Sequence, residues 1–376
     1  MNSADTVVRQ ILERLESRID LRHVEAARAR QRAALAYQPV DRLPLVIYLP
    51  FESTEFMPYP YAEAFADPAK MMVNELLVGF TSLYHAVDLP DDAPYCLRPN
   101  LGTVVIASMF GAEIRVLENN LPWVIPLDDR SIREIVDAPL PDVRAGLGQR
   151  VMDQYAYFYT AVADFPRCRA ALRFTLPDLQ GPFSVAELLW GSAIYTAFYD
   201  DVELVRGLLD KVTTQILRVY DALVGLTRDE SDGYCSQHAT IVKGKLLLRN
   251  DSMVNLSPRM YRDVILPYDQ RIGETVGSIG MHFCGNGMHQ VPNLLSIPSV
   301  QSLDLGQSEQ NDVDALYARA APQRVAILRV SVSESELNAE RLKQRFPTGV
   351  NLIFKAQSVT QARTILEQYL SESMSS

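Results

Sequence analysis

The sequence predicts an α/β protein built as a single (β/α)8 barrel of the TIM type, preceded by N-terminal helices. From Cys168 onward, short apolar runs of strand length alternate with stretches of helical periodicity, which is typical of parallel βαβ units. With the first strand included, the runs number about seven or eight, close to the repeat of this barrel. No low-complexity linker divides the 376 residues, so we expect one domain over residues 1–376, with residues 1–37 as N-terminal helices.

The composition favours a globular protein that works on small molecules. Hydrophobic residues make up 48% of the chain and charged residues 22%, which is ordinary for a globular domain. The formal net charge of −10 disfavours a nucleic-acid or anionic-membrane partner, because both require clustered Lys and Arg. Residues 1–20 are charged throughout, and the four cysteines are scattered. We therefore expect a cytoplasmic protein with reduced thiols.

The first part of the chain mixes helices and strands. Residues 6–37 have helical periodicity, and the proline-bounded apolar run at 44–49 predicts the first strand. Asp67 followed by Pro68 is typical of a helix start, which predicts a helix through His85. Residues 100–110 and 114–126 are apolar runs that predict two further strands, a small excursion from the main sheet.

The alternation is regular in the second part of the chain. The predicted strands are residues 170–176, 233–235, 280–284, 300–305, 325–330 and 352–355. The predicted helices are residues 184–190, 201–228, 257–277, 288–297, 311–321, 333–345 and 359–370. Active sites of (β/α)8 barrels collect at the carboxyl ends of the strands. The polar and reactive residues that fall there are Asp178, Gln180, Cys235, His238, His282, Cys284, Asp304 and Gln357.

His282 and Cys284 form the most specific pair, because they are the one place where a histidine and a cysteine stand two residues apart. In a strand such residues point to the same face, so imidazole and thiol would project side by side as two zinc ligands. Gly285 and Gly287 follow, which suits a turn that leaves room for a ligand or metal. The alternative interpretation is a buried cysteine beside a histidine that is bonded to a backbone carbonyl.

Three stretches resemble the uroporphyrinogen decarboxylase superfamily: residues 178–186 (DLQGPFSVA), 256–268 (LSPRMYRDVILPY) and 282–286 (HFCGN). The similarity spans roughly residues 35–370 and implies the same (β/α)8 barrel. True decarboxylases of this superfamily carry an arginine-rich R-Q-A-G-R-Y segment after the first strand. Here residues 49–55 contain no arginine and carry Glu52 and Glu55 instead. Because these carboxylates would repel a polyanionic porphyrinogen, the resemblance to that branch is the weaker one.

The H-x-C pair resembles the branch of zinc-dependent methyltransferases that work with methylated corrinoid proteins. In that branch the third zinc ligand is a cysteine near the end of the last strand, but no cysteine follows Cys284 here. A third ligand must therefore come from elsewhere, or the metal is absent. If the metal is present, we expect a carboxylate or Cys235 from another strand end. The candidates are Cys235, Glu309, His238, Asp304 and, more weakly, His289.

The resemblance implies zinc-assisted methyl transfer between a corrinoid, carried by a partner protein, and a small-molecule acceptor or donor. The direction of transfer stays open, and a homodimer is the assembly that we expect. Asp178, Gln180, Asp251 and Lys355 are the expected catalytic or pocket residues, although Asp178, Gln180 and Asp251 could instead cap turns and Lys355 could point outward. The alternatives are a metal-free decarboxylase or lyase of the same superfamily and a non-catalytic ligand-binding barrel.

Overall fold

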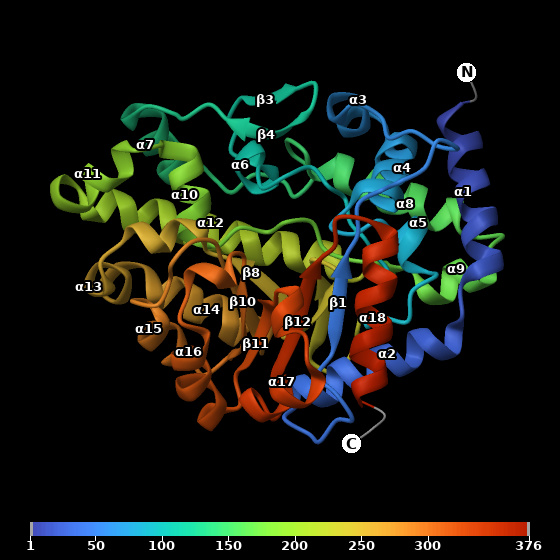
Figure 1. The fold of residues 1–376 in the computed structure, drawn as a ribbon. Helices are drawn as coiled ribbons and strands as arrows, with labels where there is room; N and C mark the ends of the chain where they lie inside the picture. The colour runs from blue at the N-terminus through green and yellow to red at the C-terminus, as the bar shows by residue number, and fades with distance from the viewer. Residues whose placement is uncertain (1–2, 374–376) are drawn as a thin grey trace.

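A six-stranded parallel sheet forms the centre of the protein (Figure 1). The computed structural model describes residues 3–373. The strand order is β1-β12-β11-β10-β9-β8, and each neighbouring pair is parallel. The strands are β1 (Leu45–Tyr48), β8 (Leu246–Arg249), β9 (Ile279–Phe283), β10 (Val300–Leu305), β11 (Ala326–Ser331) and β12 (Val350–Lys355). These six strands are a continuous part of the predicted parallel arrangement.

Two short parallel strands, β2 (Cys96–Leu97) and β5 (Arg173–Phe174), form a second sheet. An isolated parallel bridge from Gln180 to Arg249 ties the segment after β5 to β8. The segment before β2 contacts β1, because the Asp92 backbone N–H donates to the Leu45 carbonyl over 2.9 Å. Parallel strands therefore follow one another along the chain in a manner consistent with a (β/α)8 barrel, although the strand ladders within residues 3–373 do not close into a ring.

An antiparallel hairpin packs on one face of the main sheet. It consists of β6 (Tyr234–Gln237) and β7 (Thr240–Lys243), and its turn places His238 and Ala239 at positive φ, 52° and 55°. Alternate strand residues separate the two faces: Leu247 packs with the hairpin, whereas Leu246 and Leu248 join the large core. The cluster around the hairpin contains Leu35, Cys235, Ile241, Val242, Leu247, Ala326 and Leu328. The hairpin thus covers one face and carries His238 at its tip.

A second hairpin, β3 (Ile114–Leu117) and β4 (Asn120–Val124), lies at the top of the view beside α3 (Figure 1). The large core packs helices against the other face of the sheet. In the first half, the helices are α1 (Ala4–Arg18), α2 (Leu21–Leu35), α3 (Tyr61–Ala66), α4 (Pro68–Val78), α5 (Leu83–Ala86), α6 (Val105–Met109), α7 (Asp129–Asp137), α8 (Gly148–Ala161), α9 (Pro166–Ala171) and α10 (Pro182–Trp190). In the second half, they are α11 (Ala193–Asp200), α12 (Val202–Val224), α13 (Pro258–Met260), α14 (Leu266–Val276), α15 (Val291–Leu295), α16 (Val313–Ala320), α17 (Ala339–Arg345) and α18 (Val359–Ser373).

Several short turns of helix complete the chain. The 3-10 turns are η1 (Asp251–Asn255), η3 (Ser308–Gln310), η4 (Ala321–Gln323) and η5 (Glu334–Glu336), and the π-helical turn is η2 (Tyr261–Ile265). The turn η2 interrupts the predicted helix 257–277 between α13 and α14. π-turns inside helices often occur at functional sites.

Three sequence predictions were wrong. Residues 100–110 contain helix α6 and no strand, because a short buried apolar run has no periodicity that separates strand from helix. The helix that begins after Asp67 ends at Val78, with Gly79 as its C-cap, and a separate α5 follows. Residues 233–235 belong to the antiparallel hairpin, and the parallel strand at this point of the chain is β8, which follows immediately.

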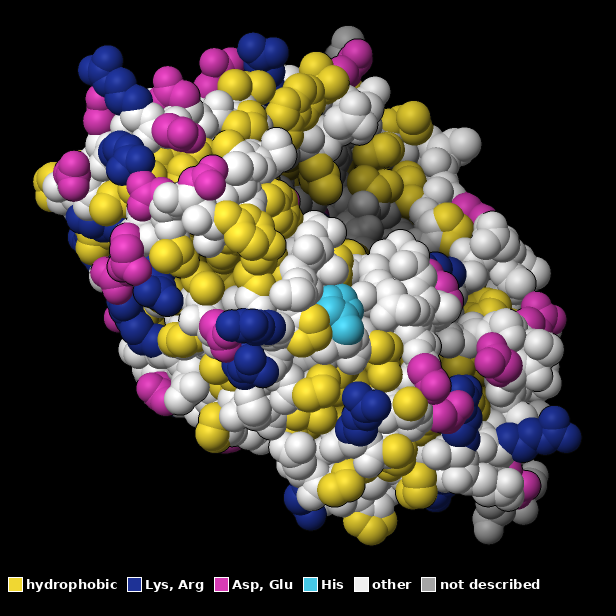
Figure 2. All heavy atoms as spheres, turned by 90° about the vertical axis from the view of Figure 1, so that its left-hand side faces the viewer, with side chains coloured by type: hydrophobic (Ala, Val, Ile, Leu, Met, Phe, Trp, Pro, Cys, Tyr) yellow, Lys and Arg dark blue, Asp and Glu magenta, His cyan; other side chains and the backbone are white. Residues whose placement is uncertain are grey.

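The surface on the side of α11, α13 and α15 mixes basic and acidic side chains, without a large basic patch on that face (Figure 2). A hollow flanked by apolar side chains opens in the same face. None of the helices within residues 3–373 combines the length and the apolar character needed to cross a membrane.

Candidate metal centre

Asp251, His282 and Cys284 bring ligand atoms together at the carboxyl ends of β8 and β9, all within 4.8 Å of one another. His282 Nε2 lies 3.4 Å from Asp251 Oδ1 and 3.6 Å from Cys284 Sγ. In tetrahedral zinc sites, with bonds of about 2.0–2.3 Å, neighbouring ligand atoms lie about 3.3–3.8 Å apart. The two distances from His282 Nε2 therefore match the spacing of ligands around one zinc ion.

Strand pairing explains why these residues meet. His282 lies on β9 and pairs in register with Arg249, the last residue of β8. Asp251 begins η1 two residues beyond Arg249, and its Oδ1 accepts a 2.8 Å hydrogen bond from the Cys284 backbone N–H. Two adjacent parallel strands thus end side by side and turn their next polar residues toward one another.

The buried Asp304 of β10 orients His282. The Asp304 Oδ2 atom lies 2.8 Å from His282 Nδ1. Arg329 Nη2 is also 3.0 Å from this nitrogen, but it donates to Asp304 Oδ2 over 3.1 Å, and the Asp304 backbone carbonyl is a second acceptor 3.2 Å from Nδ1. His282 Nδ1–H therefore donates to the carboxylate, and the lone pair of Nε2 faces Asp251 and Cys284. A carboxylate behind a histidine is the arrangement that fixes the ring and tautomer of a metal ligand.

The same Asp304 oxygen also binds His238, at 2.9 Å from Nδ1. His238 Nε2 lies 2.5 Å from Arg249 Nη2, so both of its ring nitrogens are occupied. Burial, followed by the charges of Arg329 and Arg249, lowers the pKa of His238 well below its ordinary value of 6.5. His238, His282 and Asp304 also lie close enough to hold a metal, but the adjacent guanidinium groups occupy the atoms that a metal would need. His238 supports Asp304 in this arrangement, and its role as a third ligand stays a prediction.

Asp178 and Gln180, predicted as catalytic residues, both contact Arg249, which pairs with His282 across β8 and β9. Asp178 accepts from Arg98 at 2.6 Å and pairs with Arg249 at 2.8 Å. Burial acts to raise the pKa of Asp178, but Arg249 and Arg98 together lower it below the ordinary value. Gln180 is buried and joins Arg249 through the backbone bridge. Neither residue caps α10, whose N-cap is Gly181 without a side-chain bond.

The structure does not group the two foremost candidates for the third ligand, Cys235 and Glu309, with His282 and Cys284. Cys235 is buried in the apolar cluster around the hairpin, and burial raises its thiol pKa well above the ordinary value. Glu309 is exposed on η3. His289 Nε2 lies 3.2 Å from the Leu256 carbonyl, away from the group. The carboxylate that meets His282 and Cys284 is instead Asp251, which the sequence marked as a pocket residue.

Lys355, the last residue of β12, is exposed. By strand alternation it lies on the same face as Ile353, which contacts Ala239 at the hairpin turn. Its predicted role in the pocket stays a prediction.

Glycine makes room at the centre, although at a different position from the predicted one. A Cβ at Gly287 would lie 2.5 Å from the Phe283 ring, and Gly285 is needed for its positive φ of 76°. A Cβ at Gly306, directly after β10, would lie 2.5 Å from Cys284 Sγ and 3.1 Å from His282 Cε1. Gly306 is therefore the residue that clears space beside the two ligand side chains.

Sequence reasoning missed Gly306, the half-buried Arg98 and the buried Arg249 and Arg329. A signal for two of them was present, since Arg329 interrupts the apolar strand β11 and Arg249 is the last residue of the apolar strand β8. A charge within a buried strand requires a partner. Asp304, an acidic residue within β10, is that partner for Arg329.

The electrostatics of the group favour a cation. Burial, followed by the charge of Asp251, raises the pKa of the Cys284 thiol to about 12. Asp251 pairs with no arginine or lysine among residues 3–373. A divalent ion would supply the missing positive charge, because coordination deprotonates a thiol. The donor set therefore fits zinc.

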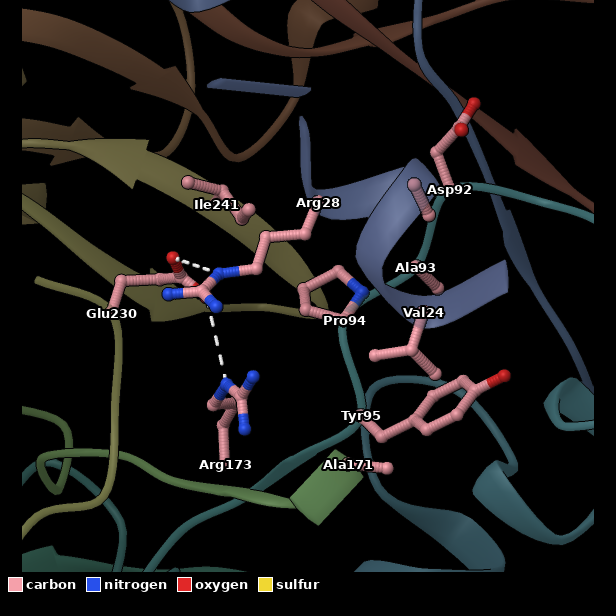
Figure 3. Close-up of a pocket in the computed structure, with 11 residues that line it drawn as sticks. Val24, Arg28, Asp92, Ala93, Pro94, Tyr95, Ala171, Arg173, Glu230 and Ile241 are labelled. Carbon is pink, nitrogen blue, oxygen red and sulfur yellow. Dashed lines mark hydrogen bonds and ion pairs between the residues drawn. The ribbon is translucent and has the colours of Figure 1, made fainter. Parts of the chain in front are cut away.

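A second polar cluster lies near the amino end of β5 and is fully paired. The buried carboxylate of Glu230 lies 2.6 Å from Arg28 Nε and 3.5 Å from Arg173 Nε (Figure 3). Arg32 Nη1 adds a third contact at 3.3 Å. With its charge compensated by protein groups, this cluster offers no ligand set.

The fold and the site together define an α/β protein with a candidate metal centre at the carboxyl edge of its parallel sheet. No family model and no curated protein matches the chain. Among solved structures, a methyltransferase from Methanosarcina mazei is similar, with a TM-score of 0.63 and 16% sequence identity. The match covers 93% of this chain and 98% of that protein. The chain therefore shares the fold of that protein over nearly its whole length, and the resemblance to the uroporphyrinogen decarboxylase superfamily stays a prediction.

Proposed function

We propose that the protein is a zinc-dependent methyltransferase that moves a methyl group between a corrinoid, carried by a partner protein, and a small molecule. The observation that carries the proposal is the group of Asp251, His282 and Cys284, with His282 Nε2 directed at the other two ligands. The likeness in fold to a methyltransferase supports it. The corrinoid rests on the resemblance of the H-x-C pair to corrinoid-linked enzymes.

Three protein ligands suit a catalytic zinc ion, which keeps a fourth position for substrate, whereas structural zinc has four protein ligands. When bound, zinc would supply the charge that lowers the pKa of a thiol or similar acceptor, and the thiolate is the reactive form. Asp251, His282 and Cys284 would hold the ion.

The other residues of the site hold this arrangement in place. Asp304 keeps the proton on His282 Nδ1 and leaves Nε2 as a donor of electrons. Asp251 fixes the turn after β9 by accepting the Cys284 backbone N–H. The pairs Arg329–Asp304 and Arg249–Asp178 balance charge below the group. The charged side chains next to the candidate ligands are therefore paired within the protein before a substrate binds.

The test is the metal content of the purified protein, measured together with methyl transfer from methylcobalamin to small thiols. We expect near-stoichiometric zinc in the wild type. Cys284→Ser should lose both zinc and transfer. Cys168→Ser is the matched control, because Cys168 lies on α9 in the core, where its Sγ contacts the Leu12 carbonyl at 3.6 Å, and it should keep both.

Full zinc content and full activity in Cys284→Ser would contradict the proposal. Absence of zinc from the wild type, combined with release of carboxylate from uroporphyrinogen, would favour the metal-free lyase instead. We expect uroporphyrinogen to be neither bound nor decarboxylated, since no arginine follows β1 in residues 49–55.

A further inference from the structure

We propose that Asn250 is the positioning residue of the candidate metal centre. This inference rests on the proposed function, because it concerns how Asp251 is held as a metal ligand. Asn250 lies between Arg249, the last residue of β8, and Asp251, the first residue of η1. Its side chain is 1% exposed. Whatever fixes Asn250 therefore fixes the turn from which the carboxylate of Asp251 reaches its neighbours.

The Asn250 backbone ties this turn to His282. Its N–H donates to the His282 carbonyl over 2.8 Å, which continues the pairing of β8 and β9 by one residue. Asp251 and His282 are thus held in one register by a main-chain bond. A shift of Asn250 would move Asp251 relative to His282 Nε2, from which it is separated by 3.4 Å.

The Asn250 side chain is anchored in the opposite direction, on α14. Its Nδ2 donates to Asp269 Oδ2 over 2.8 Å, and the Tyr261 hydroxyl donates to the same oxygen over 2.6 Å. Asp269 and Tyr261 are both 0% exposed. Tyr261 is the first residue of the π-turn η2, and Asp269 lies on α14, which follows directly. The Tyr261 hydroxyl and the Asn250 amide therefore meet at one oxygen of the Asp269 carboxylate. Asn250 Oδ1 and Asp269 Oδ1 have no hydrogen-bond partner among the described residues. The two bonds to Asp269 Oδ2 therefore hold the Asn250 amide, and breaking either one leaves a further buried polar group unpaired.

Gly181 closes the third side of Asn250. A Cβ at position 181 would lie 1.7 Å from Asn250 Oδ1, so no other residue fits there without displacing the amide. The Gly181 N–H also donates to the Arg249 carbonyl over 2.6 Å. Gly181, Tyr261 and His282 come one each from the three stretches that carried the family resemblance. Asn250 lies outside those stretches. Gly181 and His282 meet it directly, and Tyr261 reaches it through the shared Asp269 oxygen.

The experiment compares two substitutions that disturb Asn250 at a distance with two matched controls. Tyr261→Phe removes one hydroxyl, and its control Tyr155→Phe removes an equally buried hydroxyl that donates to the Thr175 carbonyl. Gly181→Ala adds a methyl group against Asn250, and its control Gly225→Ala adds one where nothing lies within 4 Å. The zinc dissociation constant is measured by chelator competition, and stability of the metal-free protein by denaturation.

A second readout does not require metal. The Cys284 backbone N–H donates to Asp251, so its hydrogen exchange in the metal-free protein reports whether Asp251 is in place. We expect Tyr261→Phe and Gly181→Ala to weaken zinc binding about 10-fold, the lower end for residues behind a metal ligand. Both should speed exchange of the Cys284 amide. Asp269→Asn, which keeps an acceptor for Tyr261 and Asn250, should retain more affinity than Asp269→Ala.

The inference is overturned if zinc affinity and Cys284 exchange in Tyr261→Phe and Gly181→Ala match those of the controls. It is also overturned if all losses scale with the loss of stability, because Asn250 would then act only in folding. A wild type that binds no zinc, but whose Cys284 amide exchanges faster in both variants, contradicts the proposed function and supports the positioning role of Asn250.

Discussion

Glu230 and Asp251 are two carboxylates near opposite ends of the parallel strands, and they differ in burial and in the number of their ion pairs. The Glu230 side chain is 1% exposed and contacts three arginines, Arg28, Arg32 and Arg173. The Asp251 side chain is 37% exposed and pairs with His282 alone among the described residues. Buried charge needs full compensation, and a charge left uncompensated near the surface is available for a ligand. The first cluster therefore stabilises the fold, and the second has the character of a site.

The largest expected effect comes from breaking the paired cluster. Glu230→Gln removes the charge that compensates three arginines, which should lower the free energy of unfolding by about 3–5 kcal/mol. Urea denaturation measures this loss. The folded fraction should still bind zinc as the wild type does, because Glu230 does not contact the candidate centre. A change in the free energy of unfolding below about 1 kcal/mol would contradict the stabilising role that we assign to the Glu230 cluster.

Asp251→Asn should have the opposite profile. Removing a ligand carboxylate should weaken zinc binding by at least about 100-fold, the upper end for substitutions behind a ligand. Stability of the metal-free protein should be unchanged or higher, since an uncompensated charge is removed. Chelator competition and urea denaturation give the two values. Unchanged zinc affinity would identify a different third ligand.

Asp91 is an intermediate case, since it is buried but held by the backbone N–H groups of Ile47 and Ala93. Burial, which outweighs these bonds, raises its pKa from 3.8 to about 7. The folded protein therefore holds this proton to a higher pH than the unfolded chain. The stabilising contribution is complete below pH 3.8 and is lost as pH rises to about 7. The free energy of unfolding, measured by urea denaturation across this pH range, should fall on the order of 1–3 kcal/mol less in Asp91→Asn than in the wild type.

Gly306→Ala tests the space beside His282 and Cys284 in the candidate metal centre and has the smallest expected effect. The added methyl group would lie 2.5 Å from Cys284 Sγ, so the thiol must move away from His282. We expect zinc affinity to fall about 10-fold, which equals about 1.4 kcal/mol. Gly225→Ala should leave affinity unchanged, because its Cβ meets nothing within 4 Å. Equal affinities in the two variants would mean that Gly306 plays no part in the centre.

The sequence alone determined most of the parallel sheet and one pair of candidate ligands. Strands β9 to β12 lie where apolar runs predicted them, at residues 280–284, 300–305, 325–330 and 352–355. A parallel strand that is buried on both faces has a nearly continuous apolar sequence, which makes it recognisable. His282 and Cys284 share one face, since strand alternation is a local property. The short runs around β2, β6 and β8 were missed or misassigned, because their type depends on which neighbour pairs with them.

Only the tertiary structure decided which side chains complete the site. Asp251 is 31 residues before His282 in the chain, and its role as the third candidate ligand follows from the pairing of β8 with β9. A thiolate is a common zinc ligand, which favoured Cys235 in the sequence. The hairpin β6–β7 instead places the Cys235 side chain in an apolar cluster. Gly306 and Asn250 have no chemical signal of their own in the sequence. Strand ends far apart in the chain converge because parallel strands bring their carboxyl ends to one edge of the sheet, and that convergence cannot be read from spacing.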